Sequence, residues 1–434
     1  MGVVSFLIPD LDRLCPYSAE TCHFVGFDGV PWTATAALEG NYLRVETTDE
    51  DSAKFVVPWQ IEGLGPIALS TGTLKRRPAA FHLPVELAGG TLYRLRNFLA
   101  AHRPFGFSPN PELRQLVASA TESFIKSAIS QSDPDAAASV AQVSIEHSCK
   151  AIQTLVESFT QFRWAGTTPL PKVWIGHEIH DGFADDPRAT VAGVPVSWKT
   201  VEPTTDDFQW SKPDDLFQLC VERRLRSLCG PLLDLRPAAL PDWIYLWQDD
   251  IGALESFVCR YVAEVVRRYA DQVHIWNCGV ALSTGADLNL SEENRLRLTV
   301  RAIETVRAHD RSTPVLVSID EPWGEYLVEE ELDLAPFQFA DMLARAEIGV
   351  SAFGLRFNIG DSCRSTLSRD GLDFSTIVDR WSTLGMPLVL MFDAASDVEC
   401  LTAATKSLIS FLRTKPAVQG IVFGERLRQL NTEG

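Results

Sequence analysis

Eight short apolar segments alternate with longer amphipathic ones from about residue 170 to the end of the chain. Each short segment has the length and composition of a β-strand. The strand candidates are 172–179, 192–198, 228–235, 273–278, 314–320, 352–357, 387–393 and 418–423. The clearest helix between them is 251–269, with acids before its start and arginines at its end, as the helix dipole favours. Strands that alternate with helices predict a parallel sheet, and eight of them favour a closed (β/α)8 TIM barrel.

The first 108 residues follow a different pattern. Residues 41–47 alternate apolar and polar positions, as a half-buried strand does, and 54–61, 66–70 and 79–87 are further strand candidates between glycines and prolines. A short helix is expected at 91–102. Two longer helices follow, each opened by a capping residue and a proline, at Asn110-Pro111 and Asp133-Pro134. We therefore expect a β-sandwich-like module (1–108), a two-helix connector (109–168) and a barrel (169–434).

Composition and charge narrow the class of protein. Hydrophobic residues make up 46% of the chain and charged residues 22%, which favours a large folded core. The net charge of −18 disfavours a nucleic-acid partner. No run approaches the ~18 apolar residues of a membrane span. The start of the chain lacks the basic residues of an export signal, and the nine cysteines form no CxxC pair, so we expect reduced thiols and a cytoplasmic location. The sequence does not indicate an oligomeric state.

Motifs for cofactors and metals are weak. No GxGxxG or GxxxxGK[ST] motif follows the first barrel strand, so no nucleotide cofactor is expected. His177 and His180 would point to opposite faces of one strand, which does not make a metal-ligand pair. Cys278 could be a nucleophile only with a paired base, and His274 lies inside the same strand, so a buried inert thiol is the simpler interpretation.

Three ordered stretches match the signatures of one enzyme family. Residues 197–216 contain Trp198-Lys199 and Glu202-Pro203, followed by a turn into an acidic helix. Residues 240–244 read Leu-Pro-Asp-Trp-Ile, and 269–277 read Tyr-Ala-Asp-Gln-Val-His-Ile-Trp-Asn. Together they resemble the second, third and fourth strand regions of family 10 glycoside hydrolases, the xylanases, and 385–393 resembles the seventh more loosely. The resemblance implies a cleft for an oligo- or polysaccharide at the carboxyl ends of the strands.

The departures from that family concern its chemistry. The family's fourth strand ends Trp-Asp-x-x-Asn-Glu and its seventh Thr-Glu-x-Asp, and these glutamates are the acid/base and the nucleophile. Here 277–282 read Asn-Cys-Gly-Val-Ala-Leu, and Leu-Met-Phe precede Asp393. Retaining hydrolysis needs two carboxyl groups about 5 Å apart, one protonated and one anionic. The resemblance therefore implies a divergent barrel that lacks both standard catalytic glutamates.

Other acids stand at strand ends, where barrel sites form. The densest group is 318–326, Ser-Ile-Asp-Glu-Pro-Trp-Gly-Glu-Tyr, in which alternation directs Ser318 and Asp320 into the barrel. Glu321 with Asp393 is the candidate non-standard catalytic pair. The alternative is that both acids only cap helices or form salt bridges at the barrel rim.

Aromatic and polar side chains near strand ends are candidates for sugar contacts, because ring faces stack on pyranose C–H faces. The candidate substrate-binding residues are Trp198, Lys199, Glu202, Asp234, Trp243, Trp276, Asn277, Asp320, Trp323 and Glu325. For each tryptophan the alternative is a buried structural role. Three hypotheses stay open: a carbohydrate-binding barrel without standard retaining activity, a hydrolase of β-linked glycans with a non-standard carboxylate pair, and a structural or interaction scaffold.

Overall fold

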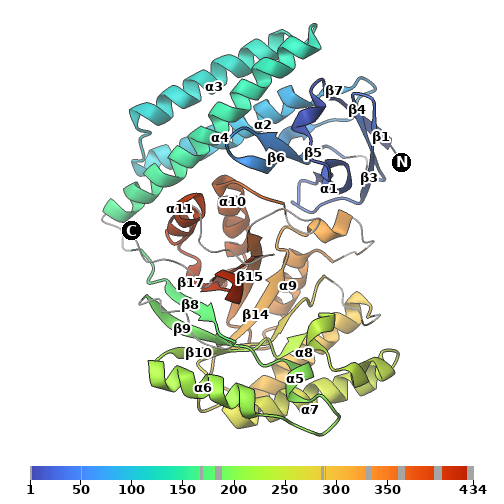
Figure 1. The fold of residues 1–434 in the computed structure, drawn as a ribbon, viewed down its shortest axis with the longest axis vertical. Helices are drawn as coiled ribbons and strands as arrows, with labels where there is room; N and C mark the ends of the chain where they lie inside the picture. The colour runs from blue at the N-terminus through green and yellow to red at the C-terminus, as the bar shows by residue number, and fades with distance from the viewer. Residues whose placement is uncertain are drawn as a thin grey trace.

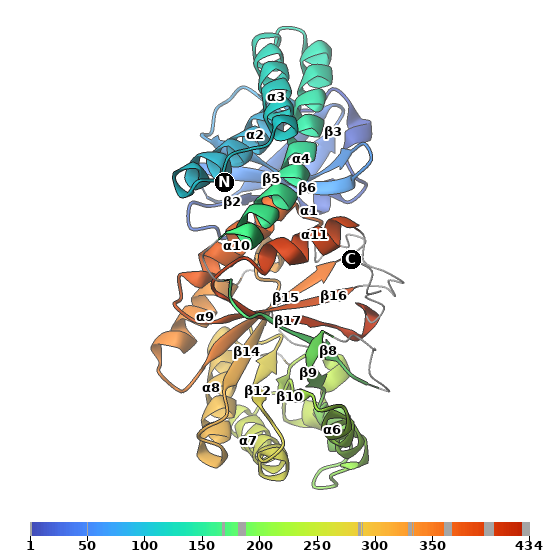
Figure 2. The same ribbon diagram turned by 90° about the vertical axis from the view of Figure 1, so that its left-hand side faces the viewer.

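The computed structural model describes residues 2–49, 51–166, 170–180, 188–284, 288, 290–328, 332, 334–359, 367–394 and 403–427. Its largest part is a closed barrel of parallel strands in the order β10-β12-β14-β15-β16-β17-β8-β9 (Figures 1 and 2). The strands are β8 (Trp174–Glu178), β9 (Ala189–Val194), β10 (Arg226–Cys229), β12 (Ile275–Asn277), β14 (Val315–Asp320), β15 (Ala352–Ile359), β16 (Leu388–Ala394) and β17 (Val418–Phe423). Each predicted strand overlaps one of these, so the (β/α)8 TIM barrel is confirmed.

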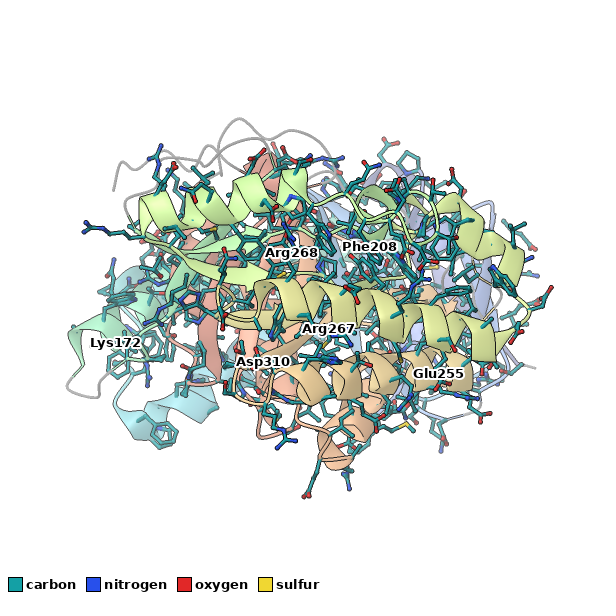
Figure 3. The ribbon with its side chains drawn as sticks, turned by 90° about the horizontal axis from the view of Figure 1, so that it is seen from below. Lys172, Phe208, Glu255, Arg267, Arg268 and Asp310 are labelled. Atoms are coloured by element: carbon teal, nitrogen blue, oxygen red, sulfur yellow. The ribbon has the colours of Figure 1, made fainter. Side chains whose placement is uncertain are left out.

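Helices surround the barrel and are linked to one another by ion pairs. The helices are α5 (Trp198–Val201), α6 (Ser211–Arg223), α7 (Ile251–Tyr269), α8 (Glu292–His309), α9 (Pro336–Arg345), α10 (Gly371–Ser382) and α11 (Ala403–Leu412). Asp250 caps α7 by accepting from the Ala253 amide at 3.0 Å, which confirms the predicted start. Figure 3 shows α6, α7 and α8 side by side, with Glu255 and Arg268 on α7. Arg268 pairs with Asp214 of α6, and Glu255 accepts from two arginines of α8.

Alternation along each strand separates an inner from an outer layer. On β14, Val315, Val317 and Ile319 pack against the helices, whereas Leu316 faces the barrel interior, as the sequence predicts. The interior cluster consists of Val191, Leu228, Leu316, Val389, Met391 and Val422, all buried. The lower barrel is therefore a packed core, and a site can form only above it, at the carboxyl ends of the strands.

Short connections at the carboxyl ends of the barrel strands add a separate pair of parallel strands and several 3-10 turns. The pair is β11 (Leu233–Asp234) with β13 (Gly279–Val280). The turns are η3 (Pro237–Ala239), η4 (Asp242–Trp247), η5 (Glu325–Val328) and η6 (Glu425–Leu427).

The N-terminal module contains two small sheets, in the orders β3-β4-β1-β7 and β2-β5-β6. Their strands are β1 (Gly2–Leu7), β2 (His23–Val25), β3 (Ala34–Glu39), β4 (Tyr42–Thr47), β5 (Ala53–Ile61), β6 (Gly65–Leu74) and β7 (Phe81–His82). The turns η1 (Leu11–Arg13) and η2 (Arg103–Phe105) and the short helix α1 (Ser18–Thr21) complete the module. Phe6 of one sheet stacks on Phe55 of the other, with 4.2 Å between ring centroids. The expected small β module is present, and its core joins both sheets.

The structure corrects the prediction for residues 79–102. Only Phe81 and His82 form a strand, and helix α2 (Leu83–His102) begins eight residues before the predicted helix at 91. The Gly89-Gly90 pair between these two predicted elements was interpreted as a turn that separates a strand from a helix. Gly90 instead lies against the backbone of β6, where an added Cβ would stand 2.1 Å from the Ser70 carbonyl oxygen. The glycine permits close contact between helix and sheet.

One long helix connects the module to the barrel. The predicted caps are confirmed: Asn110 starts α3 (Pro111–Ile129) and Asp133 starts α4 (Pro134–Ala165), each accepting a backbone N–H. The first half of α4 buries Ile145 in the core of the module, and its second half buries Leu155 in the core that surrounds the barrel. Within the described residues, no helix combines the length and apolar character needed to cross a membrane.

Gly90→Ala is expected to destabilise the protein by about 1–3 kcal/mol, since the new methyl group meets backbone atoms that cannot move aside cheaply. The matched control is Gly72→Ala on β6, where an added Cβ meets nothing within 4 Å. Urea denaturation measures both free energies of unfolding. Equal stability of the two variants would contradict the close packing of α2 on β6.

Candidate functional site

A single arginine occupies the centre of the barrel mouth. Arg356 points inward from β15, and three carboxylates from other strands surround its guanidinium. Its Nε lies 3.2 Å from Asp320 of β14, its Nη1 3.4 Å from Glu178 of β8, and its Nη2 3.8 Å from Asp393 of β16. We call these four residues the Arg356 cluster.

The cluster is largely buried but reaches solvent. The exposed side-chain fractions are 12% for Arg356, 19% for Asp320, 25% for Glu178 and 34% for Asp393. Asp320 also accepts a hydrogen bond from the Ala281 amide at 2.7 Å. These partners fix the orientation of the β14 carboxylate and leave Asp393 as the acid most open to a ligand.

Burial and neighbouring charges shift the pKa values of Asp320 and Arg356 in opposite directions. Burial raises the pKa of Asp320 above its ordinary value, against the charges of Arg356 and Arg236, which lower it. Burial lowers the pKa of Arg356, but the carboxylates of Glu178 and Asp320 outweigh that effect and leave it raised. The guanidinium therefore stays charged, whereas Asp320 holds a proton more readily than a carboxyl group in water.

Neutral side chains stand where the resemblance would require the two glutamates: Ala281, four residues after Asn277, and Met391 of β16. Asn277 ends β12 and is buried, and its Oδ1 accepts from the Ser318 hydroxyl at 3.0 Å. The same hydroxyl lies 3.3 Å from Sδ of Met391 on β16. Asn277, a candidate sugar contact, is therefore joined to a buried layer below the Arg356 cluster.

Three candidate sugar contacts are buried and are hydrogen-bonded within the protein. Trp198 is 4% exposed and donates through Nε1 to Glu202 at 2.8 Å. Glu202 is fully buried and also pairs with Arg260. Trp276 is fully buried in the outer layer, where its Nε1 donates to Asp310 at 2.9 Å. The polar atoms of these side chains therefore serve contacts within the protein.

Three further candidates are Lys199 of α5 and two residues of the segment that follows β10, Trp243 and Asp234. Lys199 pairs with the exposed Asp242 at 2.7 Å. Trp243 is half-buried, and its Nε1 donates to the Glu202 carbonyl at 3.1 Å. Asp234 binds Arg236 through both carboxylate oxygens. The Arg236 charge lowers the pKa of Asp320, so the Asp234–Arg236 pair interacts electrostatically with the Arg356 cluster.

The loop after β14 carries Trp323 and Glu325. Trp323 is half-buried, and the Arg369 guanidinium lies 4.7 Å from its ring centroid. Glu325 is 8% exposed and pairs with the same arginine. The Arg369 guanidinium thus already covers one face of the Trp323 ring, which is a candidate surface for stacking with a sugar.

The candidate catalytic pair of Glu321 and Asp393 stays a prediction. Asp393 belongs to the Arg356 cluster, and the β14 carboxylate that contacts Arg356 there is Asp320. Glu321 adopts a left-handed backbone with φ of 47° and lies near Tyr326, whose pKa is raised by burial and, to a smaller extent, by this carboxylate. His177 packs against Phe423 on the outer side of the sheet, so it does not share a centre with His180, which pairs with Glu425.

Arg356 was not among the residues predicted from the sequence, although the alternation on β15 indicates its inward orientation. Phe353, Leu355 and Phe357 face the helices, so Arg356 must face the interior together with Gly354. An inward arginine at the end of a barrel strand needs counter-charges from neighbouring strands. Applied to 352–357, this rule would have identified the centre of the site.

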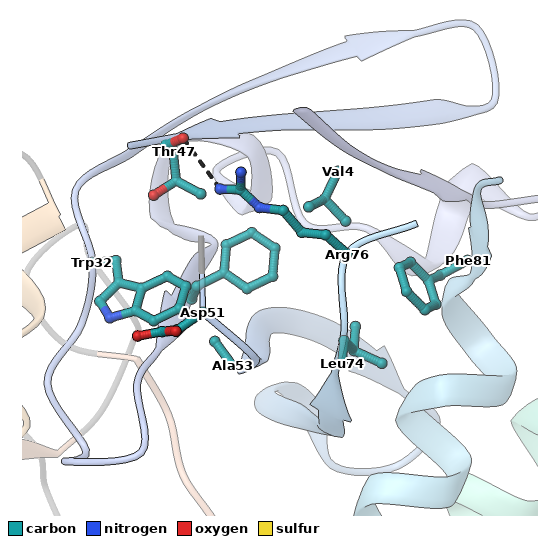
Figure 4. A pocket seen from close by; sticks show the side chains of 9 residues that line it. Val4, Trp32, Thr47, Asp51, Ala53, Leu74, Arg76 and Phe81 are labelled. Atoms are coloured by element: carbon teal, nitrogen blue, oxygen red, sulfur yellow. Dashed lines mark hydrogen bonds between the residues drawn. The ribbon is translucent and has the colours of Figure 1, made fainter. Parts of the chain in front are cut away.

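A second hollow lies in the N-terminal module (Figure 4). It encloses about 250 Å3 including open solvent, and is lined by Val4, Phe24, Trp32, Thr47, Asp51, Ala53, Leu74, Arg76 and Phe81. Arg76 extends into it and donates to the Thr47 carbonyl at 3.3 Å. Since Arg76, the cation of this hollow, already donates to a backbone carbonyl, we take the barrel mouth as the candidate site.

Comparison with known proteins finds likeness in fold. No protein-family model and no curated protein sequence matches the chain. Similar solved structures include a GH10 xylanase from Thermobacillus composti (12% identity, 59% of this chain and 84% of that one, TM-score 0.44). Native xylanase 10B from Thermotoga maritima is another (14% identity, 58% and 83%, TM-score 0.45). They belong to the family whose motifs the sequence resembles, and nothing about activity follows from likeness at this level.

Arg356→Met is expected to lower the free energy of unfolding at pH 7 by about 3–5 kcal/mol, because it leaves three carboxylates facing one another without a cation. The pKa of Asp320, already raised by burial, rises further in the variant. Folded protein then takes up a proton that the unfolded chain does not, so the deficit shrinks as the pH falls toward about 5. Urea denaturation at both pH values measures this.

The matched control is Arg345→Met, which removes an exposed pair with Asp341 on α9 and should change stability by less than about 1 kcal/mol. If Arg356→Met lost no more stability than this control, the cluster would not be the charge-balanced centre described.

Proposed function

We propose that the barrel mouth binds a saccharide and does not perform standard retaining hydrolysis. The observation that carries this proposal is the Arg356 cluster, which combines a five-donor guanidinium with three acceptor carboxylates at a partly exposed strand edge. Sugar hydroxyls both donate and accept, so they match a surface that alternates donors with acceptors.

Aromatic groups on loops that follow barrel strands support the same ligand class. Trp323 lies half-buried on the loop after β14, and Trp247 at the end of η4 is 42% exposed. Ring faces and charged hydrogen-bond partners are the two kinds of group that hold pyranose rings. The net charge of −18 suits a neutral ligand better than an anionic one.

The absence of standard chemistry follows from the residues at the two strand ends. A retaining mechanism needs a nucleophilic carboxylate and an acid about 5 Å apart. Ala281 and Met391, which stand in the places of the two glutamates, cannot attack an anomeric carbon or transfer a proton to the leaving oxygen. Asp393, the remaining acid of β16, lies 3.8 Å from the Arg356 guanidinium.

Calorimetric titration with xylo- and cello-oligosaccharides tests the proposal. We expect millimolar or tighter binding and about tenfold weaker binding by Asp393→Asn, which keeps the shape and removes a charged acceptor. Asp341→Asn on α9 is the matched control and should bind as the original protein does. No heat with either series at millimolar ligand would contradict the proposal and favour the scaffold hypothesis.

One observation favours a second candidate, an inverting hydrolase of β-linked glycans. Asp320 has a raised pKa, and Asp393 is the most exposed acid of the cluster. Both contact one guanidinium, at 3.2 and 3.8 Å, so their carboxyl groups lie within the separation of up to about 9.5 Å found in inverting enzymes.

Release of aryl alcohol from aryl glycosides separates the two candidates. The binding proposal expects no turnover above background. Turnover that Asp320→Asn and Asp393→Asn abolish would establish the inverting pair in its place. Turnover lost in Glu321→Gln instead would establish the pair expected from the sequence.

A further inference from the structure

The seam between the N-terminal module and the barrel contains a buried ion network. Arg94 of α2 donates to Asp370 at 3.1 and 2.8 Å and to Asp373 at 2.7 Å. The exposed side-chain fractions are 13%, 8% and 16%. Asp370 also caps α10 by accepting from two of its first amides. The module thus contacts the start of α10, the helix that follows β15, through these ion pairs.

The network continues to the loop after β14. Arg369 lies 3.8 Å from Asp373, pairs with Glu325, and covers the ring of Trp323. Both Arg369 and Glu325 are 8% exposed. Arg94 is therefore linked to the candidate ligand loop through one shared carboxylate and one arginine.

Backbone and apolar contacts fix the same two loops independently. The Ala68 amide of β6 donates to the Ser368 carbonyl at 2.8 Å, and Leu367 is buried against Val56 and Ala68. Thr33 donates through its hydroxyl to the Leu327 carbonyl at 3.2 Å. Every one of these bonds joins a module residue to a loop at the carboxyl ends of the barrel strands.

We propose that the N-terminal module is a clamp for two rim loops of the barrel and that Arg94 is its principal positioning residue. The clamp holds 323–328 and 367–373 in one arrangement and so fixes Trp323 and Glu325 beside the mouth. We infer that this buried ion network specifies one geometry of the two loops, which suits a positioning role. Arg94 lies in the module, on the helix side of the network, and acts on the mouth only through Asp370, Asp373 and Arg369.

Hydrogen exchange measured by mass spectrometry on the full chain tests the clamp. Arg94→Met should raise amide exchange at least tenfold in peptides covering 323–328 and 367–373. Strands β8 and β9 and helices α6 to α8, on the far side of the barrel (Figure 2), should exchange unchanged. Arg96→Met, an exposed position on the same helix, is the matched control and should leave both loops unchanged.

A general loss of stability would raise exchange across the whole barrel, and that result would overturn the proposal, as would unchanged exchange in the two loops. If Arg94→Met does not fold, Arg94→Lys serves instead. Lysine keeps the charge but cannot bridge two carboxylates in the fixed geometry of a guanidinium, so the same two loops should exchange faster, by a smaller factor.

Ligand binding gives a second measurement, which rests on the proposed function. Arg94→Met should weaken oligosaccharide binding about tenfold, whereas Arg96→Met should not. If the original protein binds no oligosaccharide, the proposed function fails and the exchange experiment still decides the clamp. If binding is present and Arg94→Met leaves both affinity and loop exchange unchanged, only the clamp fails.

Discussion

A guanidinium inside a parallel barrel requires carboxylates around it, and this requirement determines which side chains line the mouth. Arg356 cannot leave water without counter-charges, and the nearest inward positions are those at the carboxyl ends of β8, β14 and β16. Three acids that would otherwise repel one another at this edge are held together by that charge. The arginine thus allows the mouth to carry several carboxylates, and its charge opposes the effect of burial on the pKa of Asp320.

The rim loops depend on a second constraint, the continuity between module and barrel. Helix α4 contributes Ile145 to one core and Leu155 to the other, so neither core is complete without it. This shared helix sets the distance at which α2 can present Arg94 to Asp370. The module therefore meets the barrel in a fixed orientation, unlike a domain attached by a flexible linker, and its influence on the mouth is geometric.

Local sequence patterns predicted most helices and strands. The features that were predicted wrongly depend on tertiary contacts. The barrel strands and the caps at Asn110 and Asp133 follow from periodicity and capping chemistry, which act over a few residues. Gly90 was taken as a break because the sequence does not show the β6 backbone against which it packs. Trp276 was expected in a cleft because strand-end position alone does not distinguish the inner from the outer face. In each case the deciding neighbour lies far away along the chain.

The two arginine networks differ in what they leave open to a ligand. Arg369 and Glu325 are both 8% exposed, and Arg369 also covers an indole ring, so its hydrogen-bonding capacity is used within the protein. In the Arg356 cluster the most exposed member is Asp393, which lies 3.8 Å from the guanidinium and accepts a hydrogen bond from the Ala394 amide at 2.9 Å. A ligand hydroxyl that donates to this carboxylate need not break a short ion pair, and the guanidinium stabilises the charge that it meets. The closed network therefore suits positioning, and the open one suits recognition of a polar, uncharged ligand.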